Sequence, residues 1–157
     1  MKKFIIAALA LGFAGAASSA ELLATVEQGK GGASVMGLDL VSDGTVAGFS
    51  FAIELPGVEA KAIRSSNCVS QLPKGFSAQC AFSGGKVLVF AVADQPGTFL
   101  PAGVTPVGTI ALTSGLAKSG LRVSGFETSN DNGVSTPGSA KVDGVDMGDM
   151  AAEPVAK

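Results

Sequence analysis

The sequence predicts an all-β protein, an antiparallel β-sandwich of about seven to nine short strands that follows a signal peptide. Two observations carry this prediction. Apolar residues recur mostly at every second position, which is the period of a half-buried strand. Glycine and proline, 22 and 7 residues in a chain of 157, separate these segments as turns. Beyond the signal peptide no segment shows a convincing helical stripe, so the pattern favours two packed sheets.

The central strand is predicted over residues 46–55. Its alternation places one set of apolar side chains on a single face, and a Pro-Gly pair ends the strand. The buried set is Ala47, Phe49, Phe51, Ile53 and Leu55. A face so regularly apolar belongs against a core.

The clearest local signal is a β-hairpin, residues 76–82 followed by 86–93. The two strands flank Gly84-Gly85, which suits a primed turn because both positions can adopt positive φ. Pairing Ser83 with Lys86 places Cys80 opposite Val89 on an inward face. The turn and the hydrophobic pattern therefore predict the same register.

Weaker strands are predicted on either side of this hairpin. They cover residues 23–27, 34–41, 107–113 and 121–127, and a final edge strand is predicted within 140–145. Phe126 falls out of phase with Leu121 and Val123, so a bulge is expected at Gly125. Residues 94–106, with three prolines, are expected to form a long loop that could include an edge strand.

The ends of the chain predict export. Lys2 and Lys3, an apolar run over residues 4–17 and Ser18-Ser19-Ala20 have the pattern of a signal peptide cleaved before Glu21. That run is too short to cross a bilayer, which needs roughly 20 residues. The expected organisation is residues 1–20 as signal peptide, 21–142 as one β-sandwich domain and 143–157 as an acidic disordered tail. We therefore expect a periplasmic or secreted protein that does not insert into a membrane.

Two cysteines, Cys68 and Cys80, remain after cleavage. An even number of cysteines in an exported chain favours a disulfide over metal binding or redox chemistry. A catalytic thiol is the alternative, but it would lack the usual activating base because the chain has no histidine.

The composition argues against catalysis and against nucleic-acid binding. The chain holds 11 basic and 13 acidic residues; without Lys2 and Lys3 the charge is 9 − 13 = −4. No basic patch is present to neutralise phosphates. Without histidine the commonest general base and metal ligand are absent. Ser83 and Lys86 match an S-x-x-K motif, but they lie across the predicted turn instead of opening a helix. We therefore expect no enzyme and no cofactor.

Few residues stand out as candidates for a binding site. Most phenylalanines fall on predicted core faces, and Phe99, in the Pro-rich loop, is the one expected to be exposed; it either contacts a ligand or packs under the loop. Asn130-Asp131-Asn132-Gly133 has part of a calcium-loop pattern but lacks its twelve-residue spacing and terminal glutamate. An Asx/Gly turn is the preferred interpretation, and calcium is a weak alternative.

Several of these segments together resemble a cohesin-type domain, within the wider group of carbohydrate-binding-module-like sandwiches. The resemblance spans roughly residues 22–142 and rests on four pieces. They are residues 46–53 (VAGFSFAI), 85–94 (GKVLVFAVAD), 108–112 (GTIAL) and 121–127 (LRVSGFE) with the turn at 130–133. The resemblance implies a nine-stranded jelly roll. Members of cellulosomes bind calcium-loaded dockerins through one sheet face, and others serve as extracellular or periplasmic adhesion modules.

The chain departs from this family pattern in its cysteine pair, and no residue matches a diagnostic dockerin-binding motif, so dockerin binding is not carried over. The expected function is a non-catalytic binding or adhesion module that recognises a protein or a polysaccharide. The alternative is a structural subunit of a surface fibre or extracellular matrix.

Overall fold

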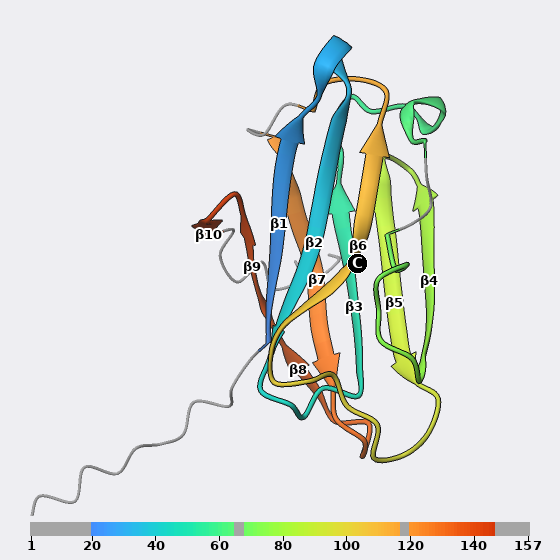
Figure 1. Ribbon diagram of the computed structural model, residues 1–157, viewed down its shortest axis with the longest axis vertical. Coiled ribbons are helices and arrows are strands. Elements are labelled where there is room, and N and C mark those ends of the chain that lie inside the picture. The colour runs from blue at the N-terminus through green and yellow to red at the C-terminus, as the bar shows by residue number, and fades with distance from the viewer. Residues whose placement is uncertain (1–19, 65–67, 117–119, 147–157) are drawn as a thin grey trace, which may run out of the picture.

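The computed structural model describes residues 20–64, 68–116 and 120–146. Two five-stranded sheets pack face to face (Figure 1), with strand orders β10-β9-β1-β2-β6 and β4-β5-β3-β7-β8. The strands are β1 (Glu21–Gln28), β2 (Ser34–Ser42), β3 (Gly48–Glu54), β4 (Phe76–Ser83), β5 (Lys86–Ala93), β6 (Gly103–Leu112), β7 (Arg122–Ser129), β8 (Ser135–Pro137), β9 (Ser139–Val142) and β10 (Val145–Asp146). The predicted β-sandwich is confirmed.

Helical structure among the described residues is limited to two single turns of 3₁₀ helix, η1 (Lys30–Gly32) and η2 (Ala60–Ala62). They connect strands at one end of the sandwich. No helix in these parts of the chain is long and apolar enough to cross a membrane.

The core lies between the sheets and is built from the alternation that the sequence shows. β3 contributes Phe49, Phe51 and Ile53, all nearly inaccessible, while Ser50 and Ala52 point outward. The facing sheet contributes the inward side chains of β1, β2 and β6, namely Leu22, Ala24, Val26, Met36, Leu38, Leu40, Val107, Ile110 and Leu112. Phe51 is stacked on Phe49 at a ring-centroid distance of 6.0 Å and meets Phe126 edge-on at 6.1 Å.

The β4–β5 hairpin has the predicted register. Ser83 pairs with Lys86, Phe82 with Val87 and Cys80 with Val89. Gly84 and Gly85 adopt φ angles of 58° and 77°, the positive values that a two-residue type I′ turn requires. The serine and lysine of the S-x-x-K motif therefore lie at the two ends of a hairpin turn.

The bulge predicted at Gly125 is present in β7. β3 and β7 stay in register up to Ser50 opposite Glu127 and resume with Ala52 opposite Ser124. Gly125 has φ 60° and, with Phe126, supplies the extra residue. The added residue turns Phe126 inward, so that it is 7% exposed, on the same side as Val123.

Two elements differ from the predictions. β6 begins at Gly103, so the loop that follows β5 ends before the predicted limit of residue 106. Pro106 lies where the β2–β6 register shifts, a position at which a strand tolerates proline.

β8 is a strand that the sequence does not predict, because Ser-Thr-Pro carries no apolar alternation. Its pairing with β7 depends on the preceding turn.

The C-terminal segment of the described chain completes the first sheet. β9 pairs in parallel with β1, and β10 pairs with β9. Asp143 connects the two strands: its N–H donates to the Ala24 carbonyl and its Oδ1 accepts from the Val26 N–H, each at 2.8 Å. β-structure therefore continues to Asp146, four residues past the predicted domain end at 142. Of the disordered tail predicted over 143–157, residues 143–146 are ordered here, and residues 147–157 lie outside those described, as does the predicted signal peptide apart from Ala20.

A disulfide joins Cys68 to Cys80 of β4, with their Cα atoms 6.1 Å apart. The segment near Cys68 also bonds to β6 in the other sheet: the N–H groups of Arg64 and Gln71 donate to the carbonyls of Ala111 and Val107. The disulfide therefore links the edge of one sheet to a segment held by the other. Cys68 is buried and Cys80 half-buried.

The approach of Gly138 to Phe126 gives a testable consequence. A Cβ at position 138 would lie 2.1 Å from Cε1 of the Phe126 ring, whereas a Cβ at Gly37 would meet nothing within 4 Å. Gly138→Ala is therefore expected to lower the free energy of unfolding by about 1–3 kcal/mol through overpacking. Gly37→Ala, in β2, should change the free energy of unfolding by no more than about 0.5 kcal/mol. Urea unfolding of both variants checks this; equal midpoints would contradict it.

Candidate functional site

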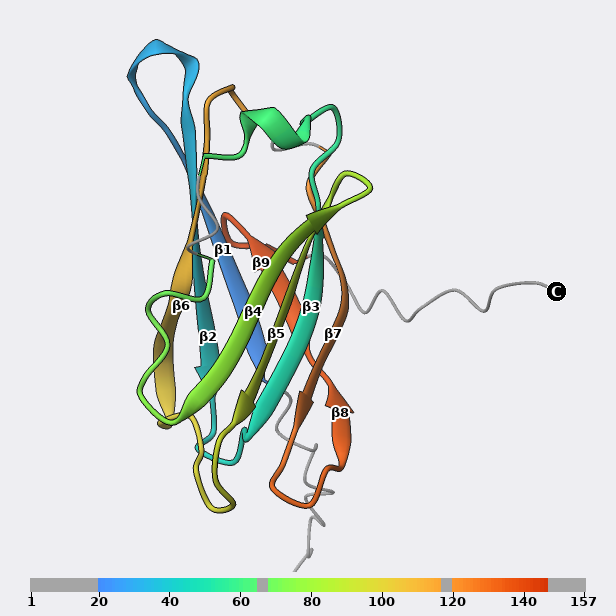
Figure 2. The ribbon, with the colours of Figure 1, turned by 90° about the vertical axis from the view of Figure 1, so that its right-hand side faces the viewer.

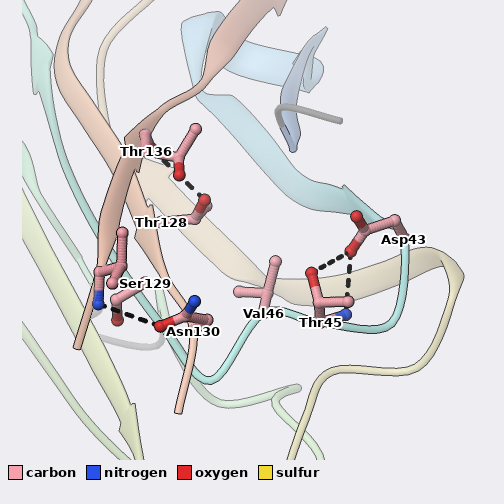
Figure 3. A pocket seen from close by; sticks show the side chains of 8 residues that line it. Asp43, Thr45, Val46, Thr128, Ser129, Asn130 and Thr136 are labelled. Carbon is pink, nitrogen blue, oxygen red and sulfur yellow. Dashed lines mark hydrogen bonds between the residues drawn. The ribbon is translucent and has the colours of Figure 1, made fainter. Parts of the chain in front are cut away.

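Two surface features are candidates for a binding site: a polar pocket at one end of the sandwich and an exposed apolar strip on β5. The pocket lies between the loop after β2 and the β7–β8 hairpin and has a volume of about 170 Å³ (Figure 3). Its lining residues are Asp43, Thr45, Val46, Thr128, Ser129, Asn130, Val134 and Thr136.

The polar groups of this pocket serve the turns that surround it. Oδ1 of Asp43 accepts from the N–H and the hydroxyl of Thr45, at 2.9 and 2.6 Å. Oδ1 of Asn130 accepts from the N–H groups of Asn132 and Val134, each at 3.0 Å. Small-molecule sites usually occupy roughly 300–1,000 Å³, so this pocket is smaller than a typical ligand site.

The stronger candidate is the outward face of β5. Leu88, Phe90 and Val92 are 44%, 53% and 41% exposed, whereas the alternating Val87, Val89 and Ala91 are at most 2% exposed. The strand is therefore apolar on both faces, and only one face is needed by the core. Leu88, Phe90 and Val92 are called the apolar stripe below.

The neighbours of the apolar stripe are uncharged and, apart from Gln79, small. Across β4 they are Ala81, Gln79 and Ser77, and across β3 they are Ala52, Ser50 and Gly48. Apart from Gln79, which lies opposite Phe90, these side chains are smaller than those of the stripe and leave its apolar surface uncovered. Charged groups stand at its ends: Lys86 pairs with Glu54 at 2.9 Å, and Asp94 accepts from the Ser77 hydroxyl at 2.5 Å.

This arrangement has the features of a protein-binding surface. A contiguous apolar patch with a polar rim on an otherwise soluble domain marks an interaction site more often than chance exposure. Aromatic residues at the centre of such a patch contribute most of the binding energy in many interfaces. Phe90 occupies that central position.

The residues predicted from sequence lie elsewhere. Phe99 is 36% exposed, in the loop between β5 and β6, and its role as a ligand contact stays a prediction. Asn130, Asp131 and Asn132 form the β7–β8 turn, where the Asn130 side chain caps two backbone N–H groups. Within residues 20–64, 68–116 and 120–146, no three His, Cys, Asp or Glu side chains are placed to hold a metal ion.

Sequence reasoning missed Phe90, which was grouped with the core phenylalanines. The residues 86–93 are almost continuously apolar, so composition alone did not distinguish the two faces. The signal was nevertheless available in the hairpin register. Placing Val89 inward, opposite Cys80, necessarily turns Phe90 outward.

Comparison with known proteins identifies the fold. No protein-family model and no curated protein matches the chain. Among solved structures, the sixth cohesin of Acetivibrio cellulolyticus scaffoldin B, determined in complex with the Cel5 dockerin, superposes with a TM-score of 0.57 at 16% identity, covering 80% of this chain and 98% of the cohesin.

Two further cohesins also superpose on the chain. The seventh ScaB type I cohesin from Pseudobacteroides cellulosolvens has a TM-score of 0.53 at 15% identity, covering 88% of this chain and 97% of its own. A non-cellulosomal cohesin from the archaeon Archaeoglobus fulgidus has a TM-score of 0.51 at 12% identity, covering 80% and 86%. The chain thus has the fold of a cohesin-type β-sandwich, as the sequence resemblance implied. At these identities the comparison defines the fold, not the ligand.

Proposed function

We propose that this chain is an exported, non-catalytic binding module that recognises a protein partner through the outer face of the β4-β5-β3-β7-β8 sheet. The apolar stripe is the observation that carries the proposal. Leu88, Phe90 and Val92 expose large apolar side chains side by side on a strand whose other face already supplies the core.

The fold supports the proposal independently of the stripe. Cohesins of Acetivibrio cellulolyticus and Clostridium thermocellum have been solved in complex with dockerins, so this sandwich can serve as a protein-binding scaffold. The absence of histidine from the chain removes the commonest general base and agrees with a non-catalytic role. Export rests on the N-terminal signal pattern and on the disulfide, which persists in oxidising compartments.

A polysaccharide is a less favoured partner for this face. Sugar-binding surfaces present aromatic rings in a row, and the chain has neither tryptophan nor tyrosine. The exposed phenylalanines among the described residues are Phe90 and Phe99, which lie in different elements, a strand and a loop.

The test uses the chain from Glu21 to Lys157 as bait in envelope and secreted fractions of the producing cell, with and without calcium. We expect a saturable protein partner whose affinity falls at least about tenfold with Phe90→Asp, because truncation of a central aromatic typically costs that much or more. Val104→Asp is the matched control: Val104 is 64% exposed on β6, in the other sheet.

Equal affinity of the two variants would contradict the assignment of this face. A partner retained only with calcium would indicate recognition of a calcium-loaded module. Release of the bait by soluble polysaccharide, with no protein retained, would favour the glycan alternative.

A further inference from the structure

The two sheets have four edges, and three of them are protected against pairing with another strand. β10 is two residues long, and β8 is three residues long and ends in Pro137. The edge of β6 is covered by a bridge between Ile63 and Leu112 and by the hydrogen bonds from Arg64 and Gln71. Short strands, proline and covering segments are the usual means by which soluble proteins block edge pairing.

Among the described residues, the fourth edge, β4, has none of these features: the disulfide attaches the Cys68 segment to it through the Cys80 side chain, and no backbone pairing with that segment accompanies the link. It is eight residues long, FSAQCAFS, with no charge and no proline, and its pairing with β5 is regular from Phe76 to Ser83. No described residue outside β5 forms a backbone hydrogen bond with it. β4 lies at the outer side of the molecule in Figure 1 and is nearest the viewer in Figure 2.

The hairpin determines which backbone groups this edge presents. In a two-residue hairpin the residues next to the turn, here Ser83 and Lys86, form a hydrogen-bonded pair, and such pairs alternate along an antiparallel ladder. The same alternation of hydrogen-bonded pairs continues to the end of the hairpin away from the turn, where the Asp94 N–H donates to the Gly75 carbonyl at 2.8 Å. Phe76, Ala78, Cys80 and Phe82 therefore direct their N–H and C=O groups away from β5.

We propose that β4 pairs antiparallel with β4 of a second copy of this chain, forming a closed dimer whose sheet is continuous across both molecules. The sequence of β4 complements itself in one register, centred on Gln79. Phe76 then lies opposite Phe82 of the other copy, and Ala78 lies opposite its Cys80. All four edge-facing residues fall in hydrogen-bonded pairs, about eight interchain bonds in total.

The side chains of β4 fit this pairing. Phe76, Ala78, Cys80 and Phe82 are only half-buried in one molecule, so the Phe76–Phe82 contacts between copies would bury apolar surface that remains exposed in the monomer. On the outer face Gln79 meets Gln79 at the two-fold axis, and Ser77 meets Ala81. No like charges oppose each other, which would otherwise disfavour the pair.

The dimer also affects the proposed binding face. A two-fold axis perpendicular to the sheet places both apolar stripes on the same side of the continuous sheet, where they can engage a repeated partner together. Because the other edges are blocked, pairing ends at two copies and does not extend into a fibre.

The register is tested by a cysteine at the two-fold axis. In Gln79→Cys the Cα atoms of the two cysteines would lie about 4.5 Å apart, the spacing of a non-hydrogen-bonded pair, which a disulfide can span. In the matched variant Ala81→Cys, on the same face of the same strand, they would be about four residues, or 14 Å, apart. We expect rapid disulfide-linked dimers from the first variant and at least tenfold slower linkage from the second, measured on non-reducing gels and by mass spectrometry.

Sedimentation equilibrium of the unmodified chain, residues 21–157, provides the second readout. We expect a reversible species of twice the monomer mass, and Gln79→Lys, which places like charges at the axis, should raise its dissociation constant at least tenfold. A monomer at every concentration up to about 1 mM, equal cross-linking at positions 79 and 81, or continued growth into filaments would each overturn the proposal.

Discussion

Replacing Phe51 by alanine is expected to lower the free energy of unfolding by about 3–5 kcal/mol, the usual loss for truncating a buried phenylalanine. Phe51 is 3% exposed and contacts the rings of both Phe49 and Phe126. Its removal would leave a cavity between the sheets and end both aromatic contacts.

The same substitution at Phe90 is the matched control. Phe90 lies on the adjacent strand, opposite Ser50, the residue before Phe51, but it points out of the sandwich and is 53% exposed. Phe90→Ala should change the free energy of unfolding by no more than about 1 kcal/mol. Urea denaturation of both variants measures the difference. Similar losses would mean that β5 does not have the orientation described, and the binding-face proposal would fail with it.

The second large effect concerns the disulfide. Removing it by Cys68→Ala with Cys80→Ala should lower the free energy of unfolding by about 2–4 kcal/mol, as expected for closing a short loop; the two cysteines are 12 residues apart. Reduction of the unmodified chain should give a similar loss while keeping both side chains, which separates the covalent link from the packing of Cys68.

Hydrogen exchange locates this effect. The disulfide ties the segment around Cys68 to β4, and the Arg64 and Gln71 N–H groups of the same segment bond to β6 carbonyls. After reduction these two amides should exchange much faster, while the Val89 amide in the β5 ladder should stay protected. Uniform acceleration across both sheets would show instead that the link stabilises the whole sandwich without a local role.

Part of the fold follows from local sequence. The β4–β5 register could be predicted because two independent signals, Gly84-Gly85 and the alternation that includes Cys80 and Val89, agree. The Gly125 bulge could be predicted because Phe126 is out of phase with Val123. The core face of β3 follows from strict alternation. In each case the physical determinant acts within a strand or across one turn.

The candidate site depended on tertiary structure. Residues 86–93 are apolar at nearly every position, so their composition does not say which side faces the core. The hairpin register turns Phe90 away from the inward Val89, but only the assembled sheets leave the Phe90 face without a covering element. The positions of β8 and β10 also required the assembled sheets, because neither has an apolar pattern of its own. By itself the sequence determined the β-sandwich class, the central strands and the pairing of its two cysteines. Only the tertiary structure decided which apolar face and which sheet edge remain uncovered, because both depend on neighbours distant along the chain.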